Sequence, residues 1–305
     1  MAGYNQILIC KFVSYLSYQM NSIFYFIIYQ ISRLPLSILY RFSDFLFFLL
    51  YTVIGYRRRV IRTNLEKSFP EKSHKEIKTI HRKFYANFCD YLVETLKSFS
   101  ISQEELDKRF TYSNLEVFDE IKTEKRDAMM MCGHIFNWEW FIGTVKHLPA
   151  KETAAVYHKI RNPFWNDKIN GMRARFGTKA IDMKDVLRFM MKAPNDGNLT
   201  YLFVADQSPK QSAIHYFINF LHQRTPAFNG FDKIARRKDM GVVFCQTEKI
   251  KRGHYHTTFI RLKPQHEEFE ENEIVHQFFS HLEKTINQHP DNWLWSHKRW
   301  KYADL

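Results

Sequence analysis

The spacing of apolar residues changes near residue 128, and this change divides the chain. Before it, apolar residues recur in steps of three and four from Ile77 to Phe99, which predicts one long helix with an apolar stripe. The capping box Ser73–Glu76 marks the start of that helix. A second capping box, Ser102–Glu105, predicts a short helix that ends near Arg109. Residues 61–125 are therefore expected to be helical.

After residue 128, short apolar runs alternate with helical patterns. The expected strands are 128–132, 153–157, 199–204, 215–220, 241–247 and 255–261. The expected helices are 136–147, 163–176, 184–192, 226–236 and 271–288. Two of these helices begin at a proline, Pro163 and Pro226, as the first helical position often does. The alternation predicts an α/β fold with a mixed central sheet flanked by helices.

The N-terminal part is the most apolar. Blocks 23–31 and 45–54 are each shorter than the roughly 20 residues that cross a bilayer, but together they are long enough, with a kink at Pro35. The basic cluster Arg57–Arg59 favours the cytoplasmic face for the rest of the chain. We expect residues 1–60 to be membrane-associated helices and residues 61–305 to form the second unit, α/β from residue 126. A pair of buried core helices is the alternative.

Charge and cysteine content narrow the classes of partner and compartment. The 305 residues carry a formal net charge of +13, which suits nucleic acid, an anionic membrane surface or phosphorylated substrates. The four cysteines, Cys10, Cys89, Cys132 and Cys245, are scattered without a CxxC pair. This pattern indicates neither a zinc site nor a disulfide framework, and it favours a reducing compartment. No cleavable signal peptide is expected.

His134 and Glu139 are the first candidates for chemistry. They follow the expected strand 128–132 through Gly133, and an imidazole with a nearby carboxylate suits general-base catalysis. On one continuous helix the two side chains would diverge by roughly 140°. They can face each other only if His134 lies in the turn, which Gly133 would ease by its backbone freedom, and Glu139 in the first turn of the next helix. A purely structural histidine is the alternative.

Three further groups leave their roles open. Arg173 and Arg175 could clamp a phosphate from a helix end, or simply be solvated there. Asp206 and Gln207 follow a strand, where α/β sheets place ligand-binding groups, but Asp is also a turn former. The aromatic and basic segment 293–301 could stack on nucleic acid, bind lipid headgroups or pack into the core.

Taken in order, the motifs resemble one known family. They are GHIFNWE (133–139), RARFG (173–177), Asp206-Gln207, Thr225-Pro226 and WLWSHKRWK (293–301), preceded by Leu34-Pro35, YRRR (56–59), RTNL (62–65), Phe69-Pro70 and Val93-Glu94. This ordered set is similar to the late acyltransferases of lipid A biosynthesis, the lauroyl and myristoyl transferases within the lysophospholipid acyltransferase superfamily. The resemblance covers nearly the whole chain and implies a glycerolphosphate-acyltransferase-like fold.

The resemblance also implies a mechanism. His134 would take the proton from a hydroxyl of the lipid acceptor, and Glu139 would orient the imidazole. The hydroxyl would attack the thioester of an acyl carrier protein, with no cofactor and no metal. Arg175, and more weakly Arg173, would contact the oxyanion or a phosphate.

Asp206, Gln207 and Asn137 would contribute to the acceptor site. Two segments depart from the family pattern: Asn219–His222 replaces an FFG sequence, and Ser208–Gln211 replaces glycines.

The partners that the resemblance implies are acyl carrier protein, a lipid A precursor and a membrane, without nucleic acid. The implied location is the bacterial inner membrane, with the catalytic part on the cytoplasmic side. Two alternatives stay open at this point. The acceptor could be another lyso-lipid, such as an aminolipid or glycolipid. The chain could also be a non-enzymatic basic protein that binds membranes or nucleic acid.

Overall fold

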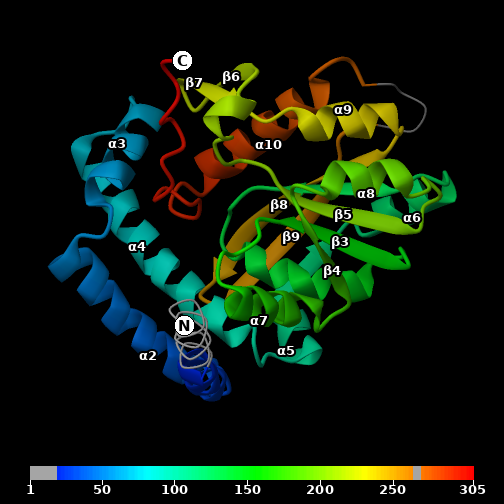
Figure 1. Ribbon diagram of the computed structural model, residues 1–305. Helices are drawn as coiled ribbons and strands as arrows, with labels where there is room; N and C mark the ends of the chain where they lie inside the picture. The colour runs from blue at the N-terminus through cyan, green and yellow to red at the C-terminus, as the bar shows by residue number, and fades with distance from the viewer. Residues whose placement is uncertain (1–18, 264–268) are drawn as a thin grey trace, which may run out of the picture.

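A seven-stranded sheet occupies the centre of the protein in a computed structural model that describes residues 19–263 and 269–305 (Figure 1). The strand order is β1-β9-β8-β2-β5-β3-β4, and all neighbours are parallel except the antiparallel pair β8–β9. The strands are β1 (Phe110–Ser113), β2 (Ala128–Cys132), β3 (Glu152–Tyr157), β4 (Thr178–Asp182), β5 (Leu199–Val204), β8 (Gly241–Lys251) and β9 (His254–Arg261). The prediction of an α/β fold with a mixed sheet is confirmed.

Helices cover both faces of this sheet. Along β2, Met129 and Met131 pack into one core while Met130 and Cys132 pack into the other, as the two-residue period of a strand requires. One face is covered by α8 (Val186–Lys192), α9 (Gly230–Arg237) and α10 (Glu273–Gln288). The opposite face carries α5 (Gln103–Asp107), α6 (Glu116–Thr123), the 3₁₀ helix η2 (Trp138–His147) and α7 (Pro163–Ala174) (Figure 1).

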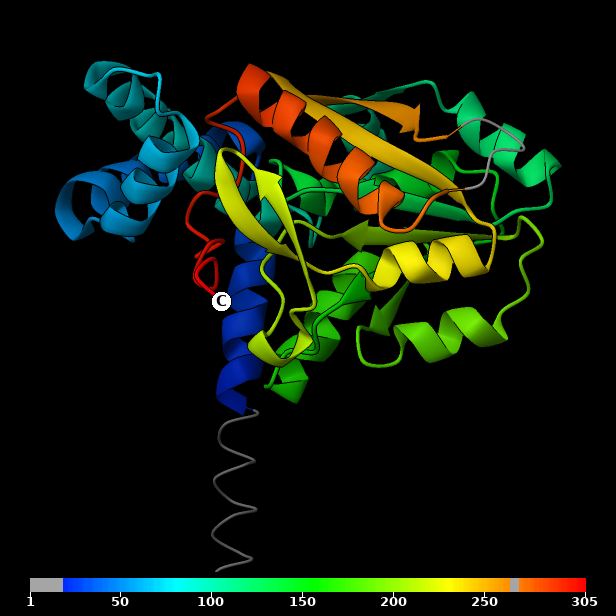
Figure 2. The ribbon, with the colours of Figure 1, turned by 90° about the horizontal axis from the view of Figure 1, so that it is seen from above.

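The N-terminal helices form an arm beside the sheet. Residues 19–32 are helical, and after a break at Pro35 the chain continues at a steep angle as α2 (Leu36–Phe47) and the π-helix η1 (Phe48–Ile54) (Figure 2). The arm is completed by α3 (Arg58–Ser68) and α4 (His74–Lys97). The segment Leu36–Ile54 has 19 residues and is long and apolar enough to cross a membrane. The prediction of a helix break at Pro35 is confirmed, whereas residues 1–18 of the predicted anchor lie outside the described residues.

Helix α4 connects this arm to the sheet. It starts at the predicted capping box, where the backbone N–H of Ser73 donates to Glu76 Oε2 at 2.8 Å. Further along, Glu94 is fully buried and accepts hydrogen bonds from Tyr40 Oη of α2 at 2.8 Å, Tyr255 Oη of β9 at 2.8 Å and Asn137 Nδ2 at 3.0 Å. Burial, helped by the charge of Asp90, raises the pKa of Glu94 to about 7. One carboxyl group thus joins the arm, the sheet and the segment after β2.

Some predicted elements differ from the structure. The expectation that residues 61–125 are all helical is wrong, because β1 already pairs with β9 there. The helix expected from Pro226 begins only at Gly230. Thr225 and Pro226 instead belong to β7 (Gln223–Ala227), which pairs with β6 (Tyr216–Phe220) in a separate hairpin. A two-stranded hairpin leaves each strand an unpaired edge, where the missing N–H of proline is tolerated.

The β6–β7 hairpin contains one of the two segments that depart from the family pattern. Its register leaves Leu221 and His222 as a two-residue turn, and both have left-handed φ angles of 50° and 61°. Such turns usually carry Gly or Asn at these positions. Leu221 is nevertheless fixed, since its side chain is buried and its N–H donates to Glu283 Oε2 at 3.0 Å.

Gly133, directly after β2, is needed for space rather than for backbone freedom. Among the glycines that the structure describes, those with left-handed φ angles are Gly55, Gly177, Gly197 and Gly253, so the turn at Gly133 does not use such an angle. A Cβ atom at Gly133 would lie 2.6 Å from Cδ1 of Leu282 on α10. The expected role of Gly133 is therefore corrected: it lets α10 approach the end of β2.

The change Gly133→Ala tests this contact. We expect the free energy of unfolding to fall by about 1–3 kcal/mol, because the added methyl group overpacks a filled core. Leu282→Ala alone should cost about 2–5 kcal/mol through the cavity it leaves. In the double variant the new methyl group occupies part of that cavity, so the two costs should not add. Additive costs in denaturant unfolding of the four proteins would contradict the proposed contact.

Glu94 provides a second test, with a pH dependence. Glu94→Ala strands three buried donors at about 1–3 kcal/mol each, so we expect at least about 3 kcal/mol of destabilisation. In the native protein the pKa of Glu94 lies near 7, above the ordinary value of 4.5. The unfolded chain loses this proton first, so stability should fall as pH rises from about 4.5 to about 7.

Glu94→Gln is the matched control, because it keeps an acceptor oxygen and does not titrate. Thermal unfolding of the detergent-solubilised protein across this pH range should show a smaller pH slope for Glu94→Gln than for the parent. Equal slopes would show that Glu94 does not titrate there.

Candidate functional site

The parallel pairing of β2 with β5 assembles the candidate site. Cys132 lies beside Val204 at the ends of the two strands, so the residues two positions further, His134 and Asp206, emerge side by side. His134 Nδ1 lies 2.5 Å from Asp206 Oδ1, and the His134 backbone N–H donates to Oδ2 at 3.0 Å. This is the carboxyl edge of the sheet, where α/β proteins bind ligands.

The environment of Asp206 fixes which nitrogen of the His134 imidazole carries the proton. Asp206 is buried, and its Oδ2 also accepts a hydrogen bond from Trp293 Nε1 at 2.6 Å. Burial alone would raise the pKa of Asp206, but the charge and hydrogen bonds of His134 and the indole of Trp293 lower it to about 2. An ionised carboxylate at Nδ1 holds the proton on that nitrogen and leaves Nε2 as the basic atom. The side-chain amide nitrogen of Gln207 lies 3.0 Å from Nε2.

Glu139 has a different partner from the one expected. His134 lies in the turn and Glu139 in the first turn of η2, as the spacing required. The carboxylate of Glu139, however, pairs with Arg173 of α7, at 2.7 Å to Nη2 and 3.2 Å to Nε. Trp138, whose ring packs edge-on against His134 at 4.8 Å, precedes it in η2. In this structure the carboxylate that contacts the imidazole of His134 is that of Asp206, and Glu139 contacts Arg173.

Arg175 and Asn137 both make hydrogen bonds within the protein. Arg175 donates to the backbone oxygens of Ser98 at 2.7 Å and Ile101 at 2.8 Å, so it fastens the end of α7 to the loop after α4. Asn137 is fully buried, donates to Glu94 and accepts from the N–H of Glu139 at 3.1 Å. Their proposed contacts with substrate stay predictions.

The C-terminal segment holds the His134 turn in place. Trp293 and Trp295 are buried, which selects core packing among the three roles that the sequence left open. Ile135 forms an antiparallel bridge with Trp293, and the N–H of Leu294 donates to the backbone oxygen of His134 at 3.2 Å. Sequence reasoning missed Trp293 as a partner of Asp206, although the alternation Trp-Leu-Trp is the pattern of an extended, half-buried segment.

Two more residues of this segment lie near Asp206. Arg299 is fully buried, and its guanidinium makes no hydrogen bond with any described residue. Burial lowers its pKa to about 10, so it remains a cation, and the charge of Asp206 favours that state. His297 accepts a hydrogen bond at Nε2 from the N–H of Ser208 at 3.3 Å, and burial lowers its pKa to about 4. No sequence signal distinguished these two from the other basic residues of the tail.

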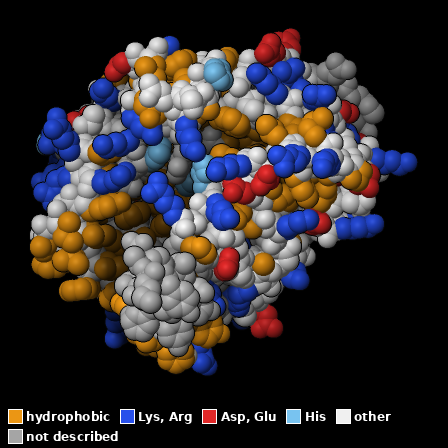
Figure 3. Space-filling model, in the orientation of Figure 1, with side chains coloured by type: hydrophobic (Ala, Val, Ile, Leu, Met, Phe, Trp, Pro, Cys, Tyr) orange, Lys and Arg blue, Asp and Glu red, His pale blue; other side chains and the backbone are white. Residues whose placement is uncertain are grey.

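The arrangement provides a base. Within residues 19–263 and 269–305, no three His, Cys, Asp or Glu side chains gather closely enough to ligate a metal ion. Figure 3 shows a hollow on the face of the molecule seen there, with Lys and Arg side chains around it. An imidazole oriented by a buried carboxylate can take a proton from a hydroxyl group.

Comparison with known proteins agrees with this chemistry. Residues 10–302 match the family described as bacterial lipid A biosynthesis acyltransferase. The chain is 23% identical to lipid A biosynthesis acyltransferase 2 of Shigella flexneri, over 78% of this chain and 76% of that protein. It is 21% identical to the lipid A biosynthesis myristoyltransferase of Escherichia coli strain K12, over 78% of this chain and 73% of that protein. The family match spans nearly the whole chain, and the protein is therefore an acyltransferase of the bacterial lipid A biosynthesis family.

Proposed function

We propose that this enzyme transfers a fatty acyl chain from the thioester of an acyl carrier protein to a hydroxyl group of a lipid A precursor. The observation that carries the proposal is the His134–Asp206 pair at the carboxyl edge of the sheet, with Nε2 of His134 left as the basic atom. Family membership supplies the reaction class.

The reaction follows from this geometry. His134 Nε2 takes the proton of the acceptor hydroxyl while its oxygen attacks the thioester carbonyl, and Asp206 stabilises the imidazolium that forms. The tetrahedral intermediate then collapses, the carbon–sulfur bond breaks, and the imidazolium returns the proton to the leaving thiolate. Gln207 now lies where the hydroxyl must come, 3.0 Å from Nε2. Its amide therefore turns aside or holds the hydroxyl in place.

The intermediate carries an oxyanion that needs hydrogen-bond donors. Of the two arginines singled out in the sequence, Arg173 is the better placed, because Glu139 ties it to the segment that carries His134. Arg175 is engaged with backbone oxygens elsewhere. We propose that Glu139 holds Arg173 ready for the oxyanion or for a phosphate of the acceptor.

Charge supports the proposed donor and acceptor. The chain has a net charge of +13, and basic side chains surround the hollow in Figure 3. Acyl carrier proteins are acidic and lipid A precursors carry phosphates, so both are attracted to such a surface. The buried Trp293 and Trp295 offer no stacking platform of the kind that single-stranded nucleic acid needs.

The apolar arm supports membrane attachment. Large side chains on it are exposed, and Figure 3 shows apolar side chains gathered over α2. Polar contacts hold the inner face of α2 to α4, among them Ser43 Oγ to Asp90 Oδ1 at 2.8 Å. A helix held in this way lies along the protein, so we propose that its outer face enters the cytoplasmic leaflet of the inner membrane without crossing it.

Substitutions in the proposed mechanism test it. With the purified enzyme, acyl carrier protein thioesters and a lipid A precursor, His134→Ala should abolish transfer. Asp206→Asn should lower kcat by about 10⁴-fold, because the imidazole is then held in the wrong tautomer. Glu139→Gln should cost less, since it only weakens the contact with Arg173.

Thermal unfolding of the same variants shows whether each loss is catalytic. If Asp206→Asn keeps full activity while Glu139→Gln loses it, Glu139 is the partner of His134 during the reaction. The acceptor is tested separately by mass spectrometry of lipid A from a deletion strain. Loss of one acyl chain is expected, and unchanged lipid A with an altered aminolipid or glycolipid would assign the enzyme to another lyso-lipid.

A further inference from the structure

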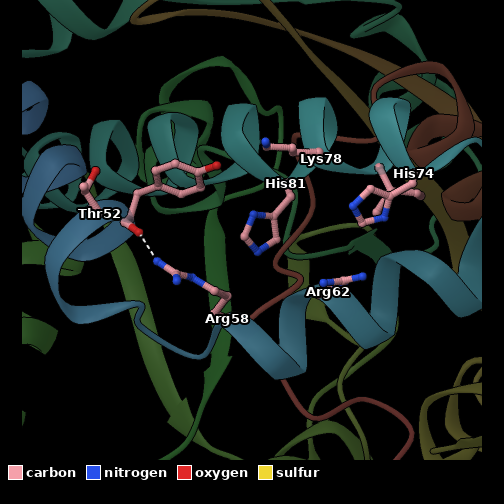
Figure 4. A pocket seen from close by; sticks show the side chains of 8 residues that line it. Thr52, Arg58, Arg62, His74, Lys78 and His81 are labelled. Atoms are coloured by element: carbon pink, nitrogen blue, oxygen red, sulfur yellow. Dashed lines mark hydrogen bonds between the residues drawn. The ribbon is translucent and has the colours of Figure 1, made fainter.

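A second basic site lies away from His134, in a cavity of about 360 Å³ between the end of η1, α3 and the first half of α4 (Figure 4). It is lined by Tyr51, Thr52, Arg58, Arg62, His74, Ile77, Lys78 and His81. Three of these eight residues are Lys or Arg, two are His, and none is Asp or Glu. The cavity is therefore built for an anion.

The cations reach the cavity from two facing helices. In Figure 4, Lys78 and His81 come from α4, and Arg58 and Arg62 come from α3 opposite them. Lys78 makes no hydrogen bond or ion pair with any other described residue. Arg62 pairs with Glu66 one turn along α3 at 2.8 Å, but both side chains are largely exposed, so that bond is weak. The positive charge of the cavity is thus not neutralised within it.

A buried polar atom also points to a ligand. His81 is 8% exposed, and its Nε2 makes no hydrogen bond of normal geometry with a described residue, although the backbone of Arg58 is close enough to act on the pKa of its imidazole. Its ring lies between Arg58 and Arg62 in Figure 4. Buried ring nitrogens are normally satisfied, so an unpaired one lining a cavity is best explained by a group that the cavity receives. A phosphate oxygen would accept a hydrogen bond from this nitrogen.

The cavity lies at the border of the apolar surface. Val53 and Ile54, the last residues of η1, are 62% and 58% exposed and directly follow Thr52 in its lining. With these side chains in the acyl region, the cavity lies at the depth of the lipid headgroups. It is distinct from the acyl-transfer site, because His81 and Tyr91, which packs on Trp138, are ten residues or about 15 Å apart along α4.

We infer that this cavity binds the phosphate group of a membrane lipid. Arg58, Arg62 and Lys78 line one cavity that has no carboxylate, and among the described residues the Arg58 side chain is bonded there only to the backbone oxygen of Tyr51. Such a set of cations suits a phosphate, which arginine binds through paired N–H donors. The phosphate could belong to an anionic phospholipid or to the acceptor lipid itself, and the chemistry of recognition is the same. The inference rests on the proposed membrane attachment but not on the roles of His134 and Asp206.

The test compares two variants of equal charge. Arg62→Gln/Lys78→Gln removes two cations from the cavity. Arg59→Gln/Lys75→Gln removes two exposed cations from the same two helices that do not line it. The full-length protein is bound to phosphatidylcholine vesicles that contain either phosphatidylglycerol or a lipid A precursor. With the vesicles that contain the natural lipid, the cavity variant should bind about tenfold more weakly for each cation removed. The control variant should lose at most about fivefold for each cation removed, because a surface cation contributes about 1 kcal/mol.

The two types of vesicle identify the source of the phosphate. A loss confined to phosphatidylglycerol vesicles assigns the cavity to membrane phospholipid, and a loss confined to precursor vesicles assigns it to the acceptor. If both variants lose the same affinity for both types of vesicle, the inference is overturned, since only diffuse charge would then matter. The variant Arg62→Lys/Lys78→Arg keeps both positive charges in the cavity and should bind the vesicles about as tightly as the parent protein. Pure phosphatidylcholine vesicles report the apolar attachment alone, so failure of that attachment is seen separately.

Discussion

The structure around the active site depends on one buried carboxylate. Asp206 is 1% exposed, and an ionised group in such a place is tolerated only when hydrogen bonds and opposite charge compensate for lost water. Its compensation comes from the turn after β2, through His134, and from the C-terminal segment, through Trp293. Because β5 supplies Asp206 itself, three segments far apart in the sequence must meet at one point. The site and the packing of the chain are therefore specified together.

Helix α4 connects this site to the apolar N-terminal helices. At one end its side chains form the basic cavity beside the apolar arm. Near the other end, Glu94 accepts hydrogen bonds from α2, from β9 and from Asn137 of the His134 segment. A rigid helix with contacts at both ends keeps the exposed apolar surface at a fixed distance from the base. This arrangement suits an enzyme whose acceptor is itself a component of the membrane.

Much of the fold could be predicted from the sequence, and the reasons for the failures are physical. Central strands such as β2 and β5 are buried on both faces, so they stand out as apolar runs between turns. The edge strands β1 and β4 are short and half polar, so no apolar run predicted them. Pro226 follows a threonine as a first helical residue often does, but it belongs to a strand. His134 and Asp206 were both singled out, but their pairing depends on strand order, which local patterns do not contain. Glu139 seemed the natural partner because it is close in sequence, whereas the 3₁₀ helix directs it to Arg173.

The bridge between Ile135 and Trp293 has a consequence for biosynthesis. Asn292 Nδ2 donates to the backbone oxygen of Phe136 across 156 residues, so the turn that carries His134 cannot be completed until the end of the chain is made. At translation rates of about 5–20 residues per second, that delay is roughly ten to thirty seconds. The apolar arm leaves the ribosome first and can reach the bilayer while the rest is still being synthesised. The oriented base is therefore completed only after the apolar arm has been synthesised, so the proposed membrane attachment could precede activity.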